Sequence, residues 1–383
     1  MSWSSVALGA ICPAKPLKKT SVDDKQDVWQ LNLDQVESNS GNILFKVKAP
    51  YSEAGNSTHW FGDQHVLYSK LRPYLNKVVL PDELGLATTE LVPLLPDPKR
   101  LDRKFLGYYL RSNEFVNWVN GQVAGAKMPR VSMKVFWEHE IPLPPLAEQK
   151  CIATILDKAD AIRRKRQQAI QLADQFLRAV FLDMFGDPVT NPKGWEAIKL
   201  GDIGTLDRGK SKHRPRNDPT LLGGDHPLIQ TGDVANSRGY IKEFNSTYSD
   251  VGLQQSRKWP KGTLCITIAA NIAKTGVLTF DACFPDSVVG FTPSNKATVE
   301  YVQYWLGFLQ KTLEASAPES AQKNINLAIL RNLDIPLPDV DEQKRFVEVV
   351  RRTVLINEKY EKSLLDNTDL FSSLSQKAFA GEL

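Results

Sequence analysis

The sequence predicts an α+β fold in which two similar globular units are joined by two long helices that pair as an antiparallel coiled coil. Three observations lead to this prediction. A ten-residue motif occurs twice, 194 residues apart in a chain of 383 residues. A long, proline-free, helix-favouring segment follows each copy. The two remaining stretches carry the short apolar runs of strands and turns. We therefore expect an internal duplication with a pseudo-two-fold axis.

The repeated motif sets the expected domain boundaries. Ile141–Lys150 reads IPLPPLAEQK and Ile335–Lys344 reads IPLPDVDEQK, with seven of ten positions identical. The predicted organisation is a first globular unit at 1–140, a long helix at 141–187, a second globular unit at 188–334 and a second long helix at 335–383.

Each globular unit shows the pattern of an α+β domain. In the first, alternating apolar runs begin at Val28, Ile43 and His65 and end at Gly, Pro, Asn or Ser, which predicts strands and turns. Apolar residues at helical spacing predict a helix over Leu101–Val119.

The second unit repeats the first at its apolar and glycine positions. Val36–Ile43 aligns with Val234–Ile241, and Phe105–Leu110 aligns with Tyr301–Leu306. The polar residues between these positions differ. We therefore expect one scaffold that presents two different surfaces, although drift alone would also produce this pattern.

Apolar residues in both long helices recur in alternating steps of three and four, which is the spacing of a coiled-coil seam. The predicted seam residues are Ile152, Ile155, Ile162, Phe176 and Val180 in the first helix and Phe346, Val349, Ile356, Phe371 and Leu374 in the second. The alternative is two independent amphipathic helices, each docked on its own domain.

The connection after the first helix favours antiparallel pairing. Each helix is about 55–60 Å long, whereas the segment from Gly186 to Trp195 spans at most about 30 Å. A connection of this length is sufficient for an antiparallel pair. It predicts globular units at opposite ends of a rod and places Gly381–Leu383 near the N-terminus.

Composition excludes several classes of protein. No apolar run is long enough to cross a bilayer, and the first residues lack the features of a signal peptide, so we expect a cytoplasmic protein. Four cysteines lie far apart, and five scattered histidines form no ligand pair, so neither a disulfide framework nor a metal site is predicted. The net charge of +4 permits nucleic-acid binding without indicating it.

A local cluster of positive charge indicates a polyanion contact. The segment from Arg208 to Arg216 holds five Lys or Arg residues and one His without an acidic residue, a concentration suited to neutralising phosphates. The candidate DNA-binding residues in this loop are Arg208, Lys210, Lys212, Arg214 and Arg216. The corresponding candidates in the first unit are Lys15, Lys18 and Lys19. The alternative is a solvated surface loop.

Two aligned turns supply further candidates. Asn39 in the first unit, and Ser237 and Arg238 in the second, have side chains that can read bases or simply build turns.

One motif tests for an enzyme. Gly204–Ser211 matches the phosphate-binding pattern G-x-x-x-x-G-K-[ST], which works only between a strand and a helix. Pro215 and Pro219 follow closely, which is unfavourable to a helix. No catalytic constellation emerges, so no catalytic residue is predicted.

The order of variable unit, motif, long helix, variable unit, motif and long helix resembles the specificity subunit of type I restriction–modification enzymes over essentially the whole chain. The two motif copies, Phe185-Gly186-Asp187 and Phe379–Leu383 carry the resemblance. Asp339, Val340 and Asp341 depart from the first copy.

The resemblance implies that the variable units are target recognition domains, each of which reads half of a split double-stranded DNA sequence. It implies that the helices form a spacer that binds two modification (methyltransferase) subunits. It also implies that S-adenosylmethionine belongs to the modification partner, and ATP with Mg²⁺ to a separate restriction and translocation partner. No cofactor is expected on this chain.

Two other classes of function remain open at this stage. One is an enzyme, either a P-loop NTPase or a self-sufficient DNA methyltransferase. The other is a coiled-coil assembly adaptor without DNA specificity.

Overall fold

The computed structural model describes residues 3–18, 22–125, 127–269, 271–316 and 325–383. The chain divides into two compact units: Met1–Gln168 with Tyr360–Leu383 form the first, and Ala169–Lys359 form the second. The predicted boundaries at 140, 187 and 334 differ from this division, because each long helix contributes to both units.

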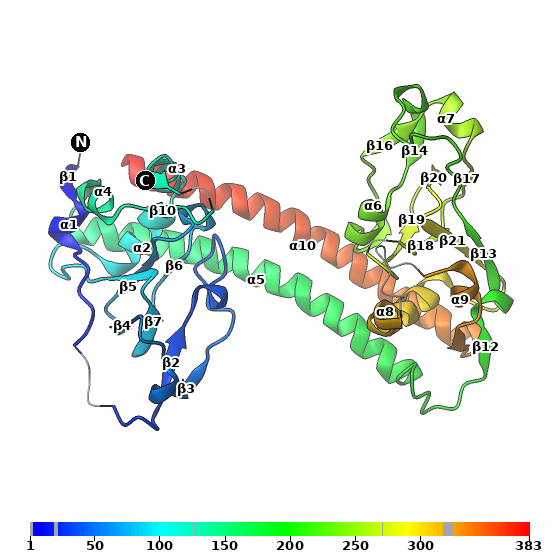
Figure 1. The fold of residues 1–383 in the computed structure, drawn as a ribbon, viewed down its shortest axis with the longest axis horizontal. Helices are drawn as coiled ribbons and strands as arrows, with labels where there is room; N and C mark the ends of the chain where they lie inside the picture. Colours follow the sequence, from blue (N-terminus) through cyan, green and yellow to red (C-terminus); the bar gives the residue numbers. More distant parts are fainter. Residues whose placement is uncertain (1–2, 19–21, 126, 270, 317–324) are drawn as a thin grey trace. The chain divides into compact units, whose positions relative to one another are not determined.

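The two long helices are α5 (Leu146–Phe185) and α10 (Val340–Ala380), drawn in green and red in Figure 1. Both end at a glycine with positive φ, Gly186 at +81° and Gly381 at +75°. Glycine takes this left-handed conformation without steric cost, so both positions are effective helix stops. The first long helix begins at Leu146, five residues later than predicted, because Ile141–Leu143 belongs to a strand.

The first unit combines a four-stranded sheet of order β3-β2-β7-β4 with a three-stranded sheet of order β6-β5-β8. Its strands are β1 (Ser4–Ala7), β2 (Asp27–Leu31), β3 (Lys48–Pro50), β4 (Thr58–Phe61), β5 (Val66–Ser69), β6 (Val78–Val79), β7 (Gly85–Thr88), β8 (Leu91–Leu94), β9 (Val123–Ala124), β10 (Arg130–Val131) and β11 (Glu140–Leu143). Its short helices are α1 (Leu8–Ile11), α2 (Arg103–Arg111), α3 (Asn113–Asn120) and α4 (Met133–Glu138), with 3-10 turns at Leu33–Gln35, Tyr51–Glu53 and Pro73–Leu75.

The second unit combines a five-stranded sheet of order β13-β21-β18-β19-β15 with a four-stranded sheet of order β16-β14-β20-β17. Its strands are β12 (Ala197–Lys199), β13 (Gly204–Arg208), β14 (Leu222–Leu228), β15 (Gly239–Ile241), β16 (Ser246–Tyr248), β17 (Lys258–Trp259), β18 (Leu264–Thr267), β19 (Thr275–Leu278), β20 (Ala282–Cys283), β21 (Val288–Pro293) and β22 (Asp334–Pro336). Its helices are α6 (Thr231–Asn236), α7 (Asp250–Gln254), α8 (Val299–Ser316) and α9 (Leu327–Arg331), with 3-10 turns at Leu200–Asp202 and Pro219–Leu221.

The repeated motif forms the same strand pair in each unit. β11 pairs antiparallel with β1, where Ile141 faces Val6, and β22 pairs antiparallel with β12, where Ile335 faces Ile198. Both motif isoleucines are fully buried. The motif thus closes each unit by joining its last strand to its first.

The long helices pair antiparallel within each unit. In the first unit the start of α5 (Ile152 and Leu156) shares a hydrophobic core with the end of α10 (Ala378 and Phe379). Because Gly381 also lies beside the Trp3 ring, the C-terminus meets the N-terminal segment, as predicted.

The second unit shows the converse arrangement. The end of α5 (Leu177, Phe181 and Phe185) shares a core with the start of α10 (Phe346 and Val350). The predicted α+β class, the internal repeat and the antiparallel helix pair are therefore confirmed.

The predicted seam is wrong at three positions. Ile162, Phe176 and Ile356 are 46%, 52% and 50% exposed, whereas Leu156 and Leu177 are buried. The remaining predicted seam residues are buried or half-buried. The buried stripe of α5 therefore moves to neighbouring positions along the helix, because an α-helix turns every 3.6 residues and not every 3.5.

Two shorter predictions also differ from the structure. The helix predicted over Leu101–Val119 is broken at Ser112, whose hydroxyl accepts a hydrogen bond from the Phe115 amide and caps α3. The strand predicted from Ile43 is limited to a single bridge between Ile43 and Val36.

Candidate nucleic-acid interface

The predicted basic loop follows β13 in the second unit and is held by main-chain bonds. The Gly209 amide donates to the Val288 carbonyl and the Lys210 amide donates to the Phe284 carbonyl. A Cβ at Gly209 would lie 2.2 Å from the Phe284 oxygen. Glycine is therefore required here because the two backbone segments approach closely.

Residues that follow α7 hold the next part of the loop. The Gln255 side-chain oxygen accepts from the Lys212 and His213 amides at 2.6 and 3.1 Å, and the Ser256 hydroxyl donates to the Lys210 carbonyl. The loop therefore has a defined conformation, and its lysine side chains project from an ordered backbone.

The arginines of the loop converge on one residue, Asp286. Arg216 forms an ion pair with Asp286, and the Arg214 guanidinium lies 3.7 Å from the same side chain. Arg208 donates to the Asp286 main-chain oxygen at 2.8 Å. Asp286 thus partly neutralises the predicted cluster, which the sequence did not indicate because Asp286 lies 70 residues after Arg216.

The lysines of the loop are the accessible cations. Lys210 and Lys212 are exposed, and neither has an ion pair within the described ranges. Sequence analysis missed Arg257 and Lys258, which directly follow the Ser256 anchor. Arg257 stacks on the Trp259 ring at 4.0 Å and reaches Asp207. The Gln255–Ser256 contact brings these cations to the loop, a proximity that the sequence does not reveal.

The phosphate-loop pattern has no phosphate-binding geometry. Gly204–Arg208 is itself a strand, whereas the pattern requires these residues to form a loop after a strand, and the chain then continues as a loop to the 3-10 turn at Pro219–Leu221. The amides of Gly209 and Lys210 are already donated to carbonyls. Among the described residues, those that follow Lys210 therefore do not begin the helix that the pattern needs to hold a phosphate.

The first unit presents lysines from a segment that borders both of its sheets. Ala14 bridges to Leu94 and Leu17 bridges to Trp60. Lys15 and Lys18 lie on this segment with exposed side chains. Lys19 lies outside the described residues. The two units therefore offer lysines at corresponding places.

The aligned turns differ in what they expose. Asn39 is exposed and has a φ of +62°, which asparagine tolerates better than most residues. Ser237 is half-buried, and its hydroxyl donates to the Val234 carbonyl at 2.8 Å, which favours the turn-building alternative at that position. Arg238 is exposed with a φ of +48° and precedes Gly239.

Hydrogen bonds close the Asn39 turn around Glu37. Its carboxylate accepts from the Ser40 hydroxyl and from the Asn42 amide group at 2.9 Å. These two bonds lower the pKa of Glu37. The turn is thus rigid on its inner side while the Asn39 side chain faces solvent.

Two features are absent from the described part of the chain. No helix in it is long and apolar enough to cross a membrane. Nor does it contain a group of three or more His, Cys, Asp or Glu side chains placed to hold a metal ion.

Comparison with known proteins places both halves of the chain in one family. The family described as "Type I restriction modification DNA specificity domain" matches residues 68–172 and 192–364. The chain is 25% identical over 307 residues to the type I restriction enzyme EcoBI specificity subunit of Escherichia coli, covering 70% of this chain and 64% of that protein. It is 26% identical over 291 residues to the MjaVIII specificity subunit of Methanocaldococcus jannaschii, covering 69% and 66%. The matches thus span slightly less than two thirds of these relatives.

A solved structure shares the fold. The type I restriction–modification S subunit from M. genitalium aligns with a TM-score of 0.62 at 16% identity, covering 99% of this chain and 96% of that one.

Proposed function

We infer the function of this chain from its family: it belongs to the type I restriction–modification DNA specificity family. We propose that it is the DNA sequence-specificity subunit of such a system and reads a bipartite duplex target. One observation carries this proposal. The family match extends into both copies of the repeat, and each copy presents exposed lysines from a corresponding segment.

Two kinds of contact, to phosphates and to bases, would have different roles in recognition. Lys210 and Lys212 in one unit, and Lys15 and Lys18 in the other, would bind phosphates and set affinity. Exposed side chains of the aligned turns, Asn39 above all, would contact base edges. Asparagine suits this role because its amide can both donate to and accept from adenine.

The long helices would serve as a spacer and as a docking surface for partners. Both expose large apolar side chains, which are Ile162, Leu172, Phe176 and Leu182 in α5 and Leu355, Ile356, Leu365 and Leu370 in α10. Contiguous patches of exposed apolar side chains are typical of protein-binding surfaces, and these residues would form such patches along the helices. The partners would be two modification subunits that carry S-adenosylmethionine, joined by restriction subunits that use ATP and Mg²⁺. This chain would be non-catalytic and would bind no cofactor.

Selection from random duplex DNA tests the proposal against the adaptor alternative. The chain is assembled with its cognate methyltransferase subunits, and bound DNA is sequenced over successive rounds. We expect enrichment of two short motifs separated by a fixed number of unread base pairs. Binding without any enriched motif would support an adaptor and contradict the specificity role.

A further inference from the structure

The turns that carry the candidate base-reading residues are fastened to the long helices at equivalent positions. We propose that Arg164 on α5 and Glu358 on α10 are positioning residues, each of which fixes the reading turn of its own unit for contact with one half of the DNA target. The proposal rests on the proposed DNA-reading function and makes the helices part of target recognition as well as a spacer.

In the first unit the anchor reaches the turn through Asn42. The Arg164 guanidinium donates to the Asn42 side-chain oxygen at 3.2 Å. The amide group of Asn42 donates in turn to Glu37, whose main-chain amide donates to the Asn42 carbonyl. These bonds form a continuous path from the helix to the backbone on both sides of Asn39.

A buried carboxylate fixes the anchor itself. Asp160 is 2% exposed and lies 3.2 Å from the Nε atom of Arg164 and 2.7 Å from Arg163. Arg111, on α2, lies 3.9 Å from the same carboxylate, and burial lowers its pKa. A guanidinium held in this way has little rotational freedom, so its position is transmitted to Asn42.

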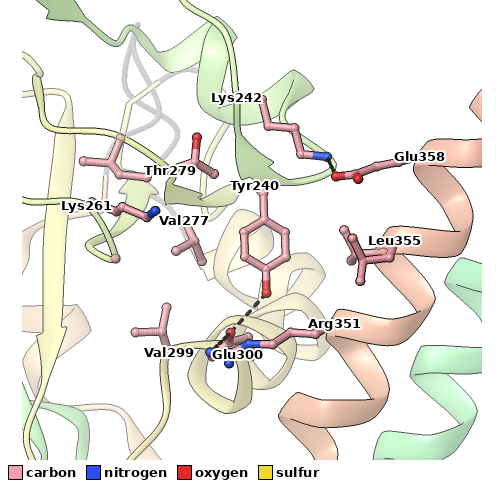
Figure 2. A pocket seen from close by; sticks show the side chains of 13 residues that line it. Tyr240, Lys242, Lys261, Val277, Thr279, Val299, Glu300, Arg351, Leu355 and Glu358 are labelled. Atoms are coloured by element: carbon pink, nitrogen blue, oxygen red, sulfur yellow. Dashed lines mark hydrogen bonds and ion pairs between the residues drawn. The ribbon is translucent and has the colours of Figure 1, made fainter. Parts of the chain in front are cut away.

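In the second unit Lys242, which lies just beyond the corresponding turn, points to Glu358 on α10, as Figure 2 shows. Glu358 forms an ion pair with Lys242, which directly follows β15. The Tyr240 hydroxyl donates to the Glu300 carboxylate at 3.1 Å, and Arg351 on α10 lies 3.5 Å from that carboxylate. The segment that begins at Gly239 is thus attached to α10 directly through Lys242 and indirectly through Tyr240 and Glu300 on α8.

The two anchors are equivalent in the repeat and opposite in charge. Asn42 aligns with Tyr240, and both follow the glycine of the aligned turn. Arg164 and Glu358 are separated by the 194-residue period of the motif. The same helix position therefore contacts the segment after the same turn in both copies, at Asn42 in the first and at Lys242, two residues beyond the equivalent Tyr240, in the second. The chemistry of the two contacts differs, as expected if each copy tunes its own turn separately.

A small displacement of such a turn would change what it reads. Base contacts need side chains held within about 0.5 Å of the productive geometry. Loss of an anchor should therefore weaken discrimination between bases in one half of the target, while phosphate contacts keep overall binding.

The test compares full-length variants in the assembled complex by selection from random DNA. The variants are Arg164→Ala and Glu358→Ala, with Lys165→Ala and Lys359→Ala as controls at the next helix position. We expect each anchor variant to lower the enrichment of preferred bases by at least about fivefold, a single base-contact effect, in one half of the motif only. Arg164→Ala and Glu358→Ala should affect opposite halves, and the controls neither.

A charge exchange separates positioning from stability. Lys242→Glu combined with Glu358→Lys should restore the enrichment that Glu358→Ala loses. Unchanged preferences in both anchor variants would overturn the proposal. Equal loss in both halves together with a lower melting temperature would also overturn it, because that result indicates a purely structural role. A wild-type complex that selects no bipartite motif contradicts the proposed function itself, which is a different result from an unchanged motif in the variants.

Discussion

Gln149 and Gln343, the glutamines of the repeated motif, are buried and hydrogen-bond the start of each long helix to a neighbouring segment. The Gln149 side chain accepts from the Asp102 amide at 2.8 Å and donates to the carbonyls of Arg100 and Pro144 at 2.8 Å. Gln343 makes the same three kinds of bond. Its partners are the Thr298 amide and the Lys296 and Pro338 carbonyls. Each glutamine therefore ties the start of a long helix to the segment that opens the domain helix, α2 or α8.

Replacing either glutamine by leucine should lower the free energy of unfolding substantially. The change leaves one amide and two carbonyls without partners in a buried place, which costs roughly 2–5 kcal/mol in total. Lys150→Ala, at the next and exposed position, should stay within about 0.5 kcal/mol of wild type. Chemical denaturation followed by circular dichroism measures both. If the Gln149→Leu variant were as stable as the Lys150→Ala control, the hydrogen bonds of Gln149 would not contribute to the free energy of unfolding.

His139 makes the stability of the first unit depend on pH. Its Nε2 atom lies 2.9 Å from the Tyr109 hydroxyl, and its ring stacks on Trp118 at 3.9 Å. Burial lowers its pKa from 6.5 to about 4. The equivalent residue of the second unit is Leu333, opposite Trp305 in place of Tyr109.

The folded state therefore favours neutral His139. Its contribution to stability is present above pH 6.5 and is lost as pH falls towards 4, by at most about 3 kcal/mol. His139→Leu should flatten the fall in stability between pH 6.5 and 4 relative to wild type. Urea titrations at several pH values give the comparison. Parallel pH curves for variant and wild type would rule out a neutral buried histidine.

At the residue scale, sequence reasoning located positions but not partners. The repeat identified the Glu-Gln motif, yet Gln149 bonds to Arg100 and Asp102, which lie 49 and 47 residues earlier. Asp160 contacts three arginines. Its role was not predicted because a lone acid on a charged helix resembles a solvated residue. Only the fold reveals its burial.

At the element scale, the positions of the long helices in the sequence were predicted, but the face that each helix buries was not. A strict three-four pattern drifts by about 20° per heptad on a straight α-helix. At Phe176, about three and a half heptads after Ile152, the drift is about 70°, which is enough to expose this side chain. Val180 stays half-buried because it packs against the core of the second unit. The domain cores also bind the helices, so Phe181 and Phe185 pack against Tyr301 on α8.

This difference predicts which helix residues stabilise the fold. Ile162→Lys and Phe176→Lys should change the free energy of unfolding by less than about 1 kcal/mol. Leu156→Ala and Leu177→Ala, at buried neighbouring positions, should cost about 2–5 kcal/mol. Thermal unfolding of the isolated chain distinguishes the two pairs. Large losses of stability in both lysine variants would instead support the seam predicted from the sequence.

The basic loop also behaves as an element, because Asp286 divides its charges into two classes. Lys210→Ala and Lys212→Ala should each reduce the slope of log affinity against log salt by about 1, since each side chain is available to a phosphate. Arg216→Ala should reduce it less, because Asp286 already holds that guanidinium. Salt titration of DNA binding by the assembled complex measures the slopes. Equal slopes in the wild type and both lysine variants would remove this loop from the interface.

The loop illustrates the limit of pattern reading for an interface. Its concentration of positive charge was visible in the sequence, but the engagement of three arginines by Asp286 was not. Arg257 and Lys258 were overlooked because they reach the loop only through the bonds of Gln255 and Ser256. Charge clustering therefore found the place, and tertiary contacts decide which cations remain available.

At the scale of the whole molecule, the duplication predicted the architecture well. The repeated motif, the long helical segments after it and the short connection from Gly186 to Trp195 together predicted two α+β units, two long helices and their antiparallel pairing. The division into compact units was not predicted, because each helix belongs half to one unit and half to the other. Motif positions report where an element begins, whereas compactness depends on which cores the element joins.

Mapping of methylated adenines tests the central claim most directly. The chain is expressed in cells together with its methyltransferase subunits, and methylated positions are sequenced across the genome. A chain that reads DNA through two domains predicts one bipartite motif with a fixed unread spacer. Each half of that motif should contain a methylated adenine. Methylation at a single uninterrupted motif, or without any motif, would contradict the account.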